Sequence, residues 1–177
     1  FLFSFGGTTK DISTMVAASA VVAVVTTFVM GTLSDKLGRR KVFICAGYVA
    51  WGITVMAFAF ISRENLGKLI GADPSSAAAL SATVTTVIVM DCIMTFMGST
   101  SNDSAFNAWI TDVTVPSNRA KTEGLLAILP VLALVIVTGV FGFIAGDDAQ
   151  ASDYSTCFLG LGILVIICGI IGIFTIK

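Results

Sequence analysis

The chain carries the stretch GTLSDKLGRRK at positions 31–41, between two long runs of apolar residues. Its glycines suit a tight connection, because Gly31 permits close helix packing and Gly38 tolerates a left-handed turn conformation. Asp35 can cap a helix end or pair with a nearby arginine. The basic residues that end the stretch suit the anionic surface of a membrane. The stretch therefore predicts a short charged hairpin between two membrane-spanning helices.

Apolar runs long enough to cross a bilayer lie on both sides of this stretch. Apolar residues make up 56% of the chain and charged residues only 12%, against about 25% charged residues in soluble domains. A spanning helix needs about 20 apolar residues, and an open strand cannot satisfy its backbone in lipid. Five runs qualify: 12–33, 42–61, 77–110, 125–145 and 154–176. The sequence thus predicts an all-α polytopic transmembrane bundle with five spanning helices.

Composition disfavours several classes of function. The chain has no histidine, the commonest general base and transition-metal ligand, and its four cysteines form no CxxC pair. Its net charge of -1 provides no basic field for nucleic acid. A membrane aspartyl protease is disfavoured because Asp91 and Asp103 fall in one predicted span. We therefore expect no enzyme activity, catalytic residue, cofactor or metal site.

The lysine and arginine residues are unevenly shared between alternate loops. Seven lie on one side: Lys36, Arg39, Arg40, Lys41, Arg119, Lys121 and Lys177. Three lie on the other: Lys10, Arg63 and Lys68. Because basic residues concentrate in cytoplasmic loops, we expect residues 34–41 to be cytoplasmic in a multi-pass protein of the cell membrane.

A second polar stretch, GSTSNDSAFNAWITD, occupies positions 98–112 inside the third predicted span. At 1.5 Å per residue, Asp103 would lie roughly 13 Å deeper than Asp112, near the middle of the ~30 Å hydrocarbon layer. An acid at that depth is costly, and it normally faces a cavity or a partner for a functional reason. Asp103 is therefore the central candidate for a binding site.

Helical spacing predicts which side chains accompany Asp103. Ser99, Phe106 and Asn107 stand four residues before, three after and four after it, so they would share its face. With the neighbouring Asn102, they complete our set of candidate substrate- or cation-binding residues. Such a stripe suits the lining of a cavity for a polar solute. A structural hydrogen-bond knot between helices is the alternative.

The 31–41 stretch resembles the signature loop between the second and third helices of the major facilitator superfamily, G-x-L-[A/S]-D-[R/K]-x-G-R-[R/K]. The resemblance implies that the chain supplies helices two to six of a twelve-helix transporter. We accordingly expect a further helix before residue 1 and a C-terminal half after residue 177. In that family the loop acts as a conformational latch. The latch residues implied here are Gly31, Asp35, Gly38, Arg39 and Arg40.

The run 103–112 is similar to the fourth helix of the glycoside–pentoside–hexuronide cation symporters. There a mid-membrane aspartate, followed three residues later by an aromatic residue, helps to bind cation and sugar. The likeness implies that Asp103 binds the coupling cation, a proton or sodium. Those symporters also carry acids in helix two, whereas residues 12–33 contain none. This departure disfavours a sodium site of their kind and leaves proton coupling and uncoupled transport open.

The two polar stretches and their resemblances predict a secondary active transporter that works by alternating access in the lipid bilayer. Its expected cargo is a small polar solute, with sugars among the candidates, and coupling to a proton or sodium is expected. Two alternatives stay open. One is a drug or metabolite antiporter of the same superfamily, and the other is a polytopic receptor or scaffold that transports nothing.

Overall fold

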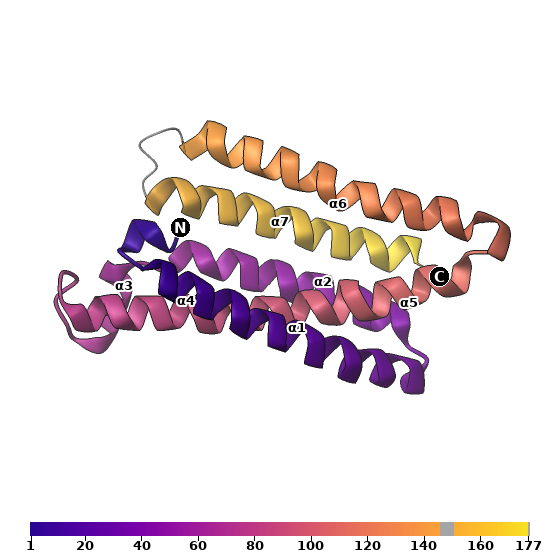
Figure 1. Ribbon diagram of the computed structural model, residues 1–177, viewed down its shortest axis with the longest axis horizontal. Helices are drawn as coiled ribbons and strands as arrows, with labels where there is room; N and C mark the ends of the chain where they lie inside the picture. The colour runs from indigo at the N-terminus through magenta and orange to yellow at the C-terminus, as the bar shows by residue number, and fades with distance from the viewer. Residues whose placement is uncertain (146–150, 177) are drawn as a thin grey trace.

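Long helices lie side by side along the longest dimension of this computed structural model, which describes residues 1–145 and 151–176 (Figure 1). In chain order the elements are η1 (Phe3–Phe5), α1 (Thr9–Leu37), α2 (Arg40–Ala57), η2 (Phe58–Phe60), α3 (Arg63–Ile70), α4 (Ala77–Gly98), η3 (Ser99–Phe106), α5 (Asn107–Val113), α6 (Pro116–Ala145) and α7 (Ala151–Thr175). Here η1 and η2 are single 3-10 turns, and η3 is a π-helical segment. Within these described ranges, five helices are long and apolar enough to cross a membrane, counting α2–η2 and α4–η3–α5 as one each. The predicted all-α bundle is therefore confirmed.

The α1–α2 connection is as short as its sequence suggests. Gly38 ends α1 with a φ of 59°, a left-handed conformation that costs a glycine little, and its amide donates to the carbonyls of Ser34 and Asp35. Helix α2 starts at Arg40. At the other end of α1, the side chains and amides of Thr8 and Asp11 form a reciprocal capping box. Both ends of this helix are thus set by local hydrogen bonds.

Helix α3 has no counterpart among the five predicted runs. The Ser62 side chain accepts a hydrogen bond from the Asn65 amide at its start, and Gly71 ends it with a φ of 68°. Ser76 then caps α4 by accepting a hydrogen bond from the Ala79 amide. The loop between the second and third spans is therefore partly helical.

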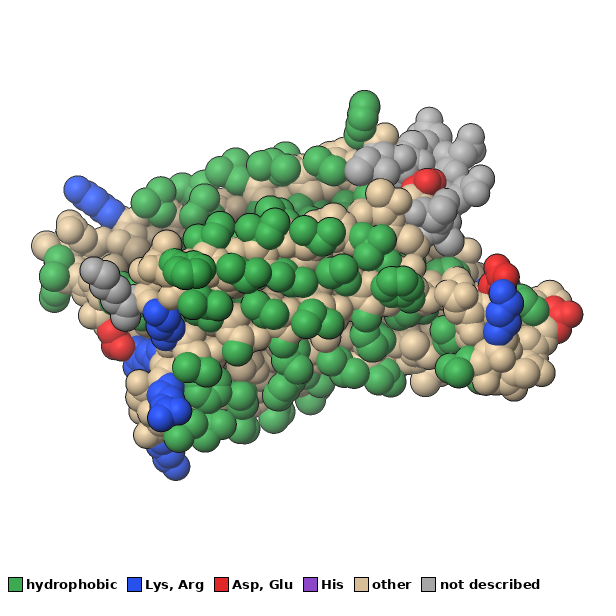
Figure 2. Space-filling model, turned by 180° about the vertical axis from the view of Figure 1, so that it is seen from behind, with side chains coloured by type: hydrophobic (Ala, Val, Ile, Leu, Met, Phe, Trp, Pro, Cys, Tyr) green, Lys and Arg blue, Asp and Glu red, His purple; other side chains and the backbone are tan. Residues whose placement is uncertain are grey.

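Charged side chains gather at the two ends of the molecule, with a long apolar band between them (Figure 2). The loop joining α1 to α2 and the loop joining α5 to α6 lie at the same end (Figure 1). This arrangement brings together the basic residues of 36–41 with Arg119 and Lys121. The two loops therefore share one side of the bundle, as their basic residues predict.

Helices α2 and α7 pack along a seam of glycines. A Cβ on Gly52 would lie 2.7 Å from the backbone carbonyl of Gly162, and one on Gly169 would lie 3.0 Å from the Tyr48 Cβ. No larger side chain fits at such separations. Small residues allow this close approach in membranes, where burial of apolar groups gives little drive for association. Gly162, Gly169 and Gly172 of α7 all face α2, whereas Gly142 in α6 has nothing within 4 Å.

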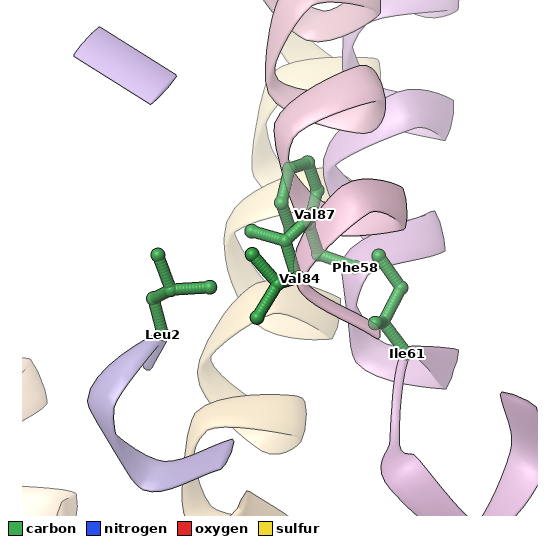
Figure 3. Packing of buried hydrophobic residues seen from close by; sticks show 5 residues of the cluster. All are labelled: Leu2, Phe58, Ile61, Val84 and Val87. Carbon is green, nitrogen blue, oxygen red and sulfur yellow. The ribbon is translucent and has the colours of Figure 1, made fainter. Parts of the chain in front are cut away.

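Buried apolar residues form two clusters in the part of the chain that the structure describes. One lies near the α3 end and consists of Leu2, Phe58, Ile61, Val84 and Val87 (Figure 3). The other consists of Ile44, Cys45, Ala105 and Ile176. The Phe58 ring stacks on Phe158 of α7 with centroids 5.3 Å apart, which ties η2 to α7. Helix α6 packs along α7 (Figure 1), and its most apolar window has no buried residue. The exterior of the bundle is therefore apolar, as a lipid-facing surface requires.

Candidate functional site

The polar stretch around Asp103 forms a π-helical segment inside the third spanning helix. The Asn107 amide donates to the Asn102 carbonyl, five residues back, where an α-helix would use four. Ser101 is fully buried, and its Cβ would lie 2.6 Å from a Cβ added to Gly47 of α2. Isolated π turns are uncommon and occur frequently at functional sites. The wide turn and the facing glycine let η3 lie directly against α2.

Most buried hydroxyls of η3 are satisfied within the helix itself. Thr100 donates to the Phe96 carbonyl at 2.7 Å, Ser101 to the Met97 carbonyl at 2.9 Å and Ser104 to the Thr100 carbonyl at 2.6 Å. These bonds remove much of the cost of burying polar groups in an apolar bundle. The stretch therefore presents few free polar groups toward its helical neighbours, apart from the group around Asp103.

Two neutral side chains donate hydrogen bonds to the Asp103 carboxylate. The Ser99 hydroxyl lies 2.8 Å from one carboxylate oxygen, and the Asn102 amide nitrogen lies 3.1 Å from the other. The Asn107 side chain instead donates to the Asp103 backbone carbonyl at 3.2 Å. Among the described residues, no lysine or arginine forms an ion pair with Asp103. The carboxylate is exposed on the surface of the bundle, so its charge is open to a group from outside these helices.

Tyr48 of α2 extends this network. Its hydroxyl donates to the Asn102 side-chain oxygen at 2.9 Å, and the ring of Trp51 lies 5.7 Å from its own. Because the Asn102 side-chain oxygen accepts from Tyr48, the side-chain nitrogen, which can only donate, is left to face Asp103. Neither Tyr48 nor Trp51 was among the residues predicted from the sequence. The sequence feature that could have pointed to them is a tyrosine and a tryptophan three residues apart in the middle of an apolar helix.

A cavity of about 260 Å³ lies over this network. It is lined by the polar groups of Ser99, Asn102 and Asp103 and by the ring of Trp51. Ala23 of α1 closes another side. Three elements that are far apart in the sequence thus meet around one carboxylate.

Phe106 lies elsewhere. It lines a separate cavity of about 430 Å³ between α2, α5 and α7, where its ring is 5.9 Å from that of Trp109. Phe106 was expected on the same face as Asp103 because residues three apart share a face of an α-helix. A π turn contains about one more residue than an α turn, so this spacing no longer holds. Among the sequence-predicted residues, Ser99, Asn102 and Asp103 therefore line one cavity, and Asn107 contacts only the Asp103 backbone through its side chain.

Arg40 bridges two acids at the loop end of the bundle. Its guanidinium pairs with Asp35 of α1 at 2.9 Å and with Asp112 of α5. Both carboxylates remain more than half exposed, at 57% and 56%. Sequence analysis took Asp112 only as the end of the third span. Arg40 thus joins three helices through their charged ends.

The other loop residues have distinct positions. Arg39 is exposed and precedes α2, and it forms no ion pair with the part of the chain that the structure describes. A Cβ on Gly31 would lie 3.8 Å from the Ser104 Cβ, so this glycine brings α1 close to η3. Gly38 supplies the left-handed turn. The two glycines therefore shape the backbone, while Asp35 and Arg40 carry the charge contact.

Acids at the opposite end are satisfied locally. Hydrogen bonds from the Ser75 side chain and backbone amide, at 2.6 and 2.8 Å, hold the pKa of Asp73 below its usual value. The Lys68 ammonium, 2.7 Å from Glu64, lowers the pKa of that carboxyl in the same way. Within the described ranges no three His, Cys, Asp or Glu side chains group as metal ligands would. These contacts stabilise a loop and form no second site.

Comparison with known proteins gives a family for the whole chain. The sequence matches the Major Facilitator Superfamily over residues 1–177. No curated protein and no solved structure matches it. The family match agrees with the five apolar helices and with the GTLSDKLGRRK loop. The chain therefore belongs to the major facilitator superfamily, a family of multi-pass membrane transporters.

Proposed function

We propose that this protein is a secondary active transporter of a small polar solute, and that Asp103 binds the solute or the coupling ion. The observation that carries the proposal is the Asp103 carboxylate, which is held by Ser99 and Asn102 without a cation and borders a cavity. An unpaired acid within a spanning helix is costly and is normally kept for function. A proton, a sodium ion or the hydroxyls of a solute would each balance it.

The cavity favours a polyhydroxylated cargo such as a sugar. Asp103, Asn102 and Ser99 supply acceptors and donors on one wall, and Trp51 supplies an aromatic face on another. A few fixed polar groups beside an aromatic surface are typical of sites that orient small ligands. The absence of acids from residues 12–33 favours a proton over sodium as the coupling ion.

We also propose that the Asp35–Arg40–Asp112 group is the latch of the transport cycle. Its three members come from α1, α2 and α5, so any movement of these helices relative to one another must change the two ion pairs. The remaining latch candidates act through the backbone turn at Gly38 and the close contact at Gly31, with Arg39 held at the same loop.

Uptake by the full-length protein in proteoliposomes tests the proposal. A panel of labelled sugars, polyols and amino acids is offered with and without a proton or sodium gradient. Asp103→Asn keeps the shape and removes the carboxylate's negative charge, so gradient-driven accumulation should vanish while exchange of solute persists. Asp103→Ala should lose both. Glu64→Gln, which removes an exposed carboxylate outside the spans, is the matched control.

The outcomes distinguish the alternatives. Full accumulation by a normally folded Asp103→Asn protein eliminates the coupling role. Movement only of apolar drugs against a proton gradient indicates an antiporter. A folded protein that binds a solute but moves none indicates a receptor.

We further propose that residues 34–41 lie on the cytoplasmic side. The support is the excess of basic residues at that end. Cysteine introduced at exposed Ser117 or exposed Leu69 in a background without native cysteines tests it. An impermeant maleimide on intact cells should label Leu69→Cys alone, and labelling of Ser117→Cys alone would reverse the orientation.

A further inference from the structure

A long apolar groove follows one face of α2 beside the end of α7. Its α2 lining repeats every three or four residues, as one helical face does: Lys41, Val42, Cys45, Ala46, Val49 and Ile53. Ile173 of α7 forms the facing wall, and the volume is about 460 Å³. The groove lies apart from the Asp103 cavity, with which it shares no lining residue.

The length of the groove fits one acyl chain. From Lys41 to Ile53 the helix rises about 18 Å at 1.5 Å per residue, and one leaflet of a ~30 Å hydrocarbon layer is about 15 Å deep. Ala46 leaves room between the larger Val42 and Val49. Val42 and Ile53 are 57% exposed each, so the groove opens to the side of the bundle, where lipid chains lie.

The mouth of the groove carries a positive charge. Lys41 is exposed and forms no ion pair with the described residues, whereas the neighbouring Arg40 is already held by two carboxylates. A lysine can lay its methylene stem on apolar surface and keep its ammonium in the headgroup layer. Basic residues where a spanning helix meets the interface attract anionic headgroups.

We propose that this groove binds one anionic phospholipid, with an acyl chain along α2 and the headgroup phosphate at Lys41. Apolar length and charge both match such a lipid, and both are needed. A zwitterionic lipid could place an acyl chain in the groove, but it has no net negative charge to pair with Lys41. A soluble phosphate ester could pair with Lys41, but it has no acyl chain to fill the groove. The lipid comes from the leaflet that faces the α1–α2 loop. The proposal does not depend on which solute is transported.

Native mass spectrometry of the full-length protein tests this site. The protein in detergent is titrated with phosphatidylglycerol or phosphatidylcholine of the same acyl length, and with glycerol 3-phosphate as the soluble arm. We expect the first phosphatidylglycerol to bind more tightly than phosphatidylcholine, with no detectable glycerol 3-phosphate. Lys41→Gln should weaken that first lipid about fivefold, the loss expected for one basic side chain near an anionic surface.

Matched variants separate the site from diffuse charge. Lys41→Arg should bind as the parent does, and Lys36→Gln, at the same end but outside the groove, should change binding little. Ala46→Phe fills the groove and should weaken both lipids while the thermal midpoint is kept. Equal affinity for the two lipids, or equal losses in Lys36→Gln and Lys41→Gln, would overturn the proposal.

Discussion

Two groups of acidic side chains, one at the loop end and one in the third spanning helix, differ in what holds their charge. Asp35 and Asp112 share the guanidinium of Arg40 at the loop end, where water reaches both carboxylates. Asp103, inside the bundle's apolar band, is held by Ser99 and Asn102, which carry no charge. An acid paired with a cation on another helix fixes the relative position of the two helices, and it loses that role when the cation moves away. An acid held by neutral donors keeps a net negative charge, which a bound cation or the hydroxyls of a solute can balance.

The largest expected effect comes from separating η3 from α2. Gly47→Val adds atoms where even a Cβ would lie 2.6 Å from the Ser101 Cβ, so the π segment must shift. Overpacking of this kind costs about 1–3 kcal/mol, and the Tyr48–Asn102 bond that positions the Asp103 group should break. We expect a lower thermal midpoint and no measurable uptake in proteoliposomes.

Gly139→Val is the matched control for that substitution. Gly139 lies in α6 with no neighbour within 4 Å, so the added methyls meet open space. Near-parental stability and uptake are expected. If the two valine variants behave alike, close packing of η3 on α2 does not support the site.

An intermediate effect is expected at the charged end. Arg40→Gln removes the cation shared by Asp35 and Asp112, whereas Asp35→Asn and Asp112→Asn each leave one pair intact. Exposed pairs contribute about 0.2–1 kcal/mol each, so the arginine variant should slow maximal uptake by roughly two- to thirtyfold and each acid variant by less.

Salt provides the check on that ranking. Because both carboxylates are exposed, screening should shrink the difference between parent and Arg40→Gln as ionic strength rises. The same salt series should leave the Asp103→Asn defect unchanged, since that substitution removes the carboxylate that we propose binds the solute or the coupling ion. A salt-independent Arg40→Gln defect would argue that the arginine acts by packing.

The smallest effect is expected from one hydroxyl. Tyr48→Phe removes the donor to Asn102 and keeps the ring beside Trp51. A hydrogen bond of this type contributes about 0.5–1.5 kcal/mol, so the half-saturating solute or ion concentration should rise about two- to tenfold while maximal uptake is kept. Tyr154→Phe, at the start of α7, serves as the control. Equal behaviour of the two variants would remove Tyr48 from the site.

The sequence was sufficient for the parts of the structure that depend on local chemistry. Apolar runs of spanning length predict the five-helix bundle, because lipid leaves the backbone no other satisfied state. Gly38 is left-handed, as its place in a tight connection suggests. Ser99 lies against Asp103, since one helical turn separates them.

Contacts between distant segments were not predictable in this way. Arg40 reaches Asp112 from another helix, and no local pattern specifies that pairing. The π segment lies against Gly47 of α2, a contact between distant parts of the chain, and Phe106 lines a different cavity from Asp103. Helix α3 was missed because it is short and polar and has no spanning length.

The two-residue link between α1 and α2 has a mechanical consequence. Helix α1 has 29 residues and is joined to α2 only through Gly38 and Arg39, so the two helices cannot separate at that end. A tilt of about 10° about this pivot would move the far end of a ~43 Å helix by about 7 Å. Arg40, next to the fulcrum, would move far less. A small rotation at the α1–α2 turn would therefore become a large displacement at Thr9, the far end of α1.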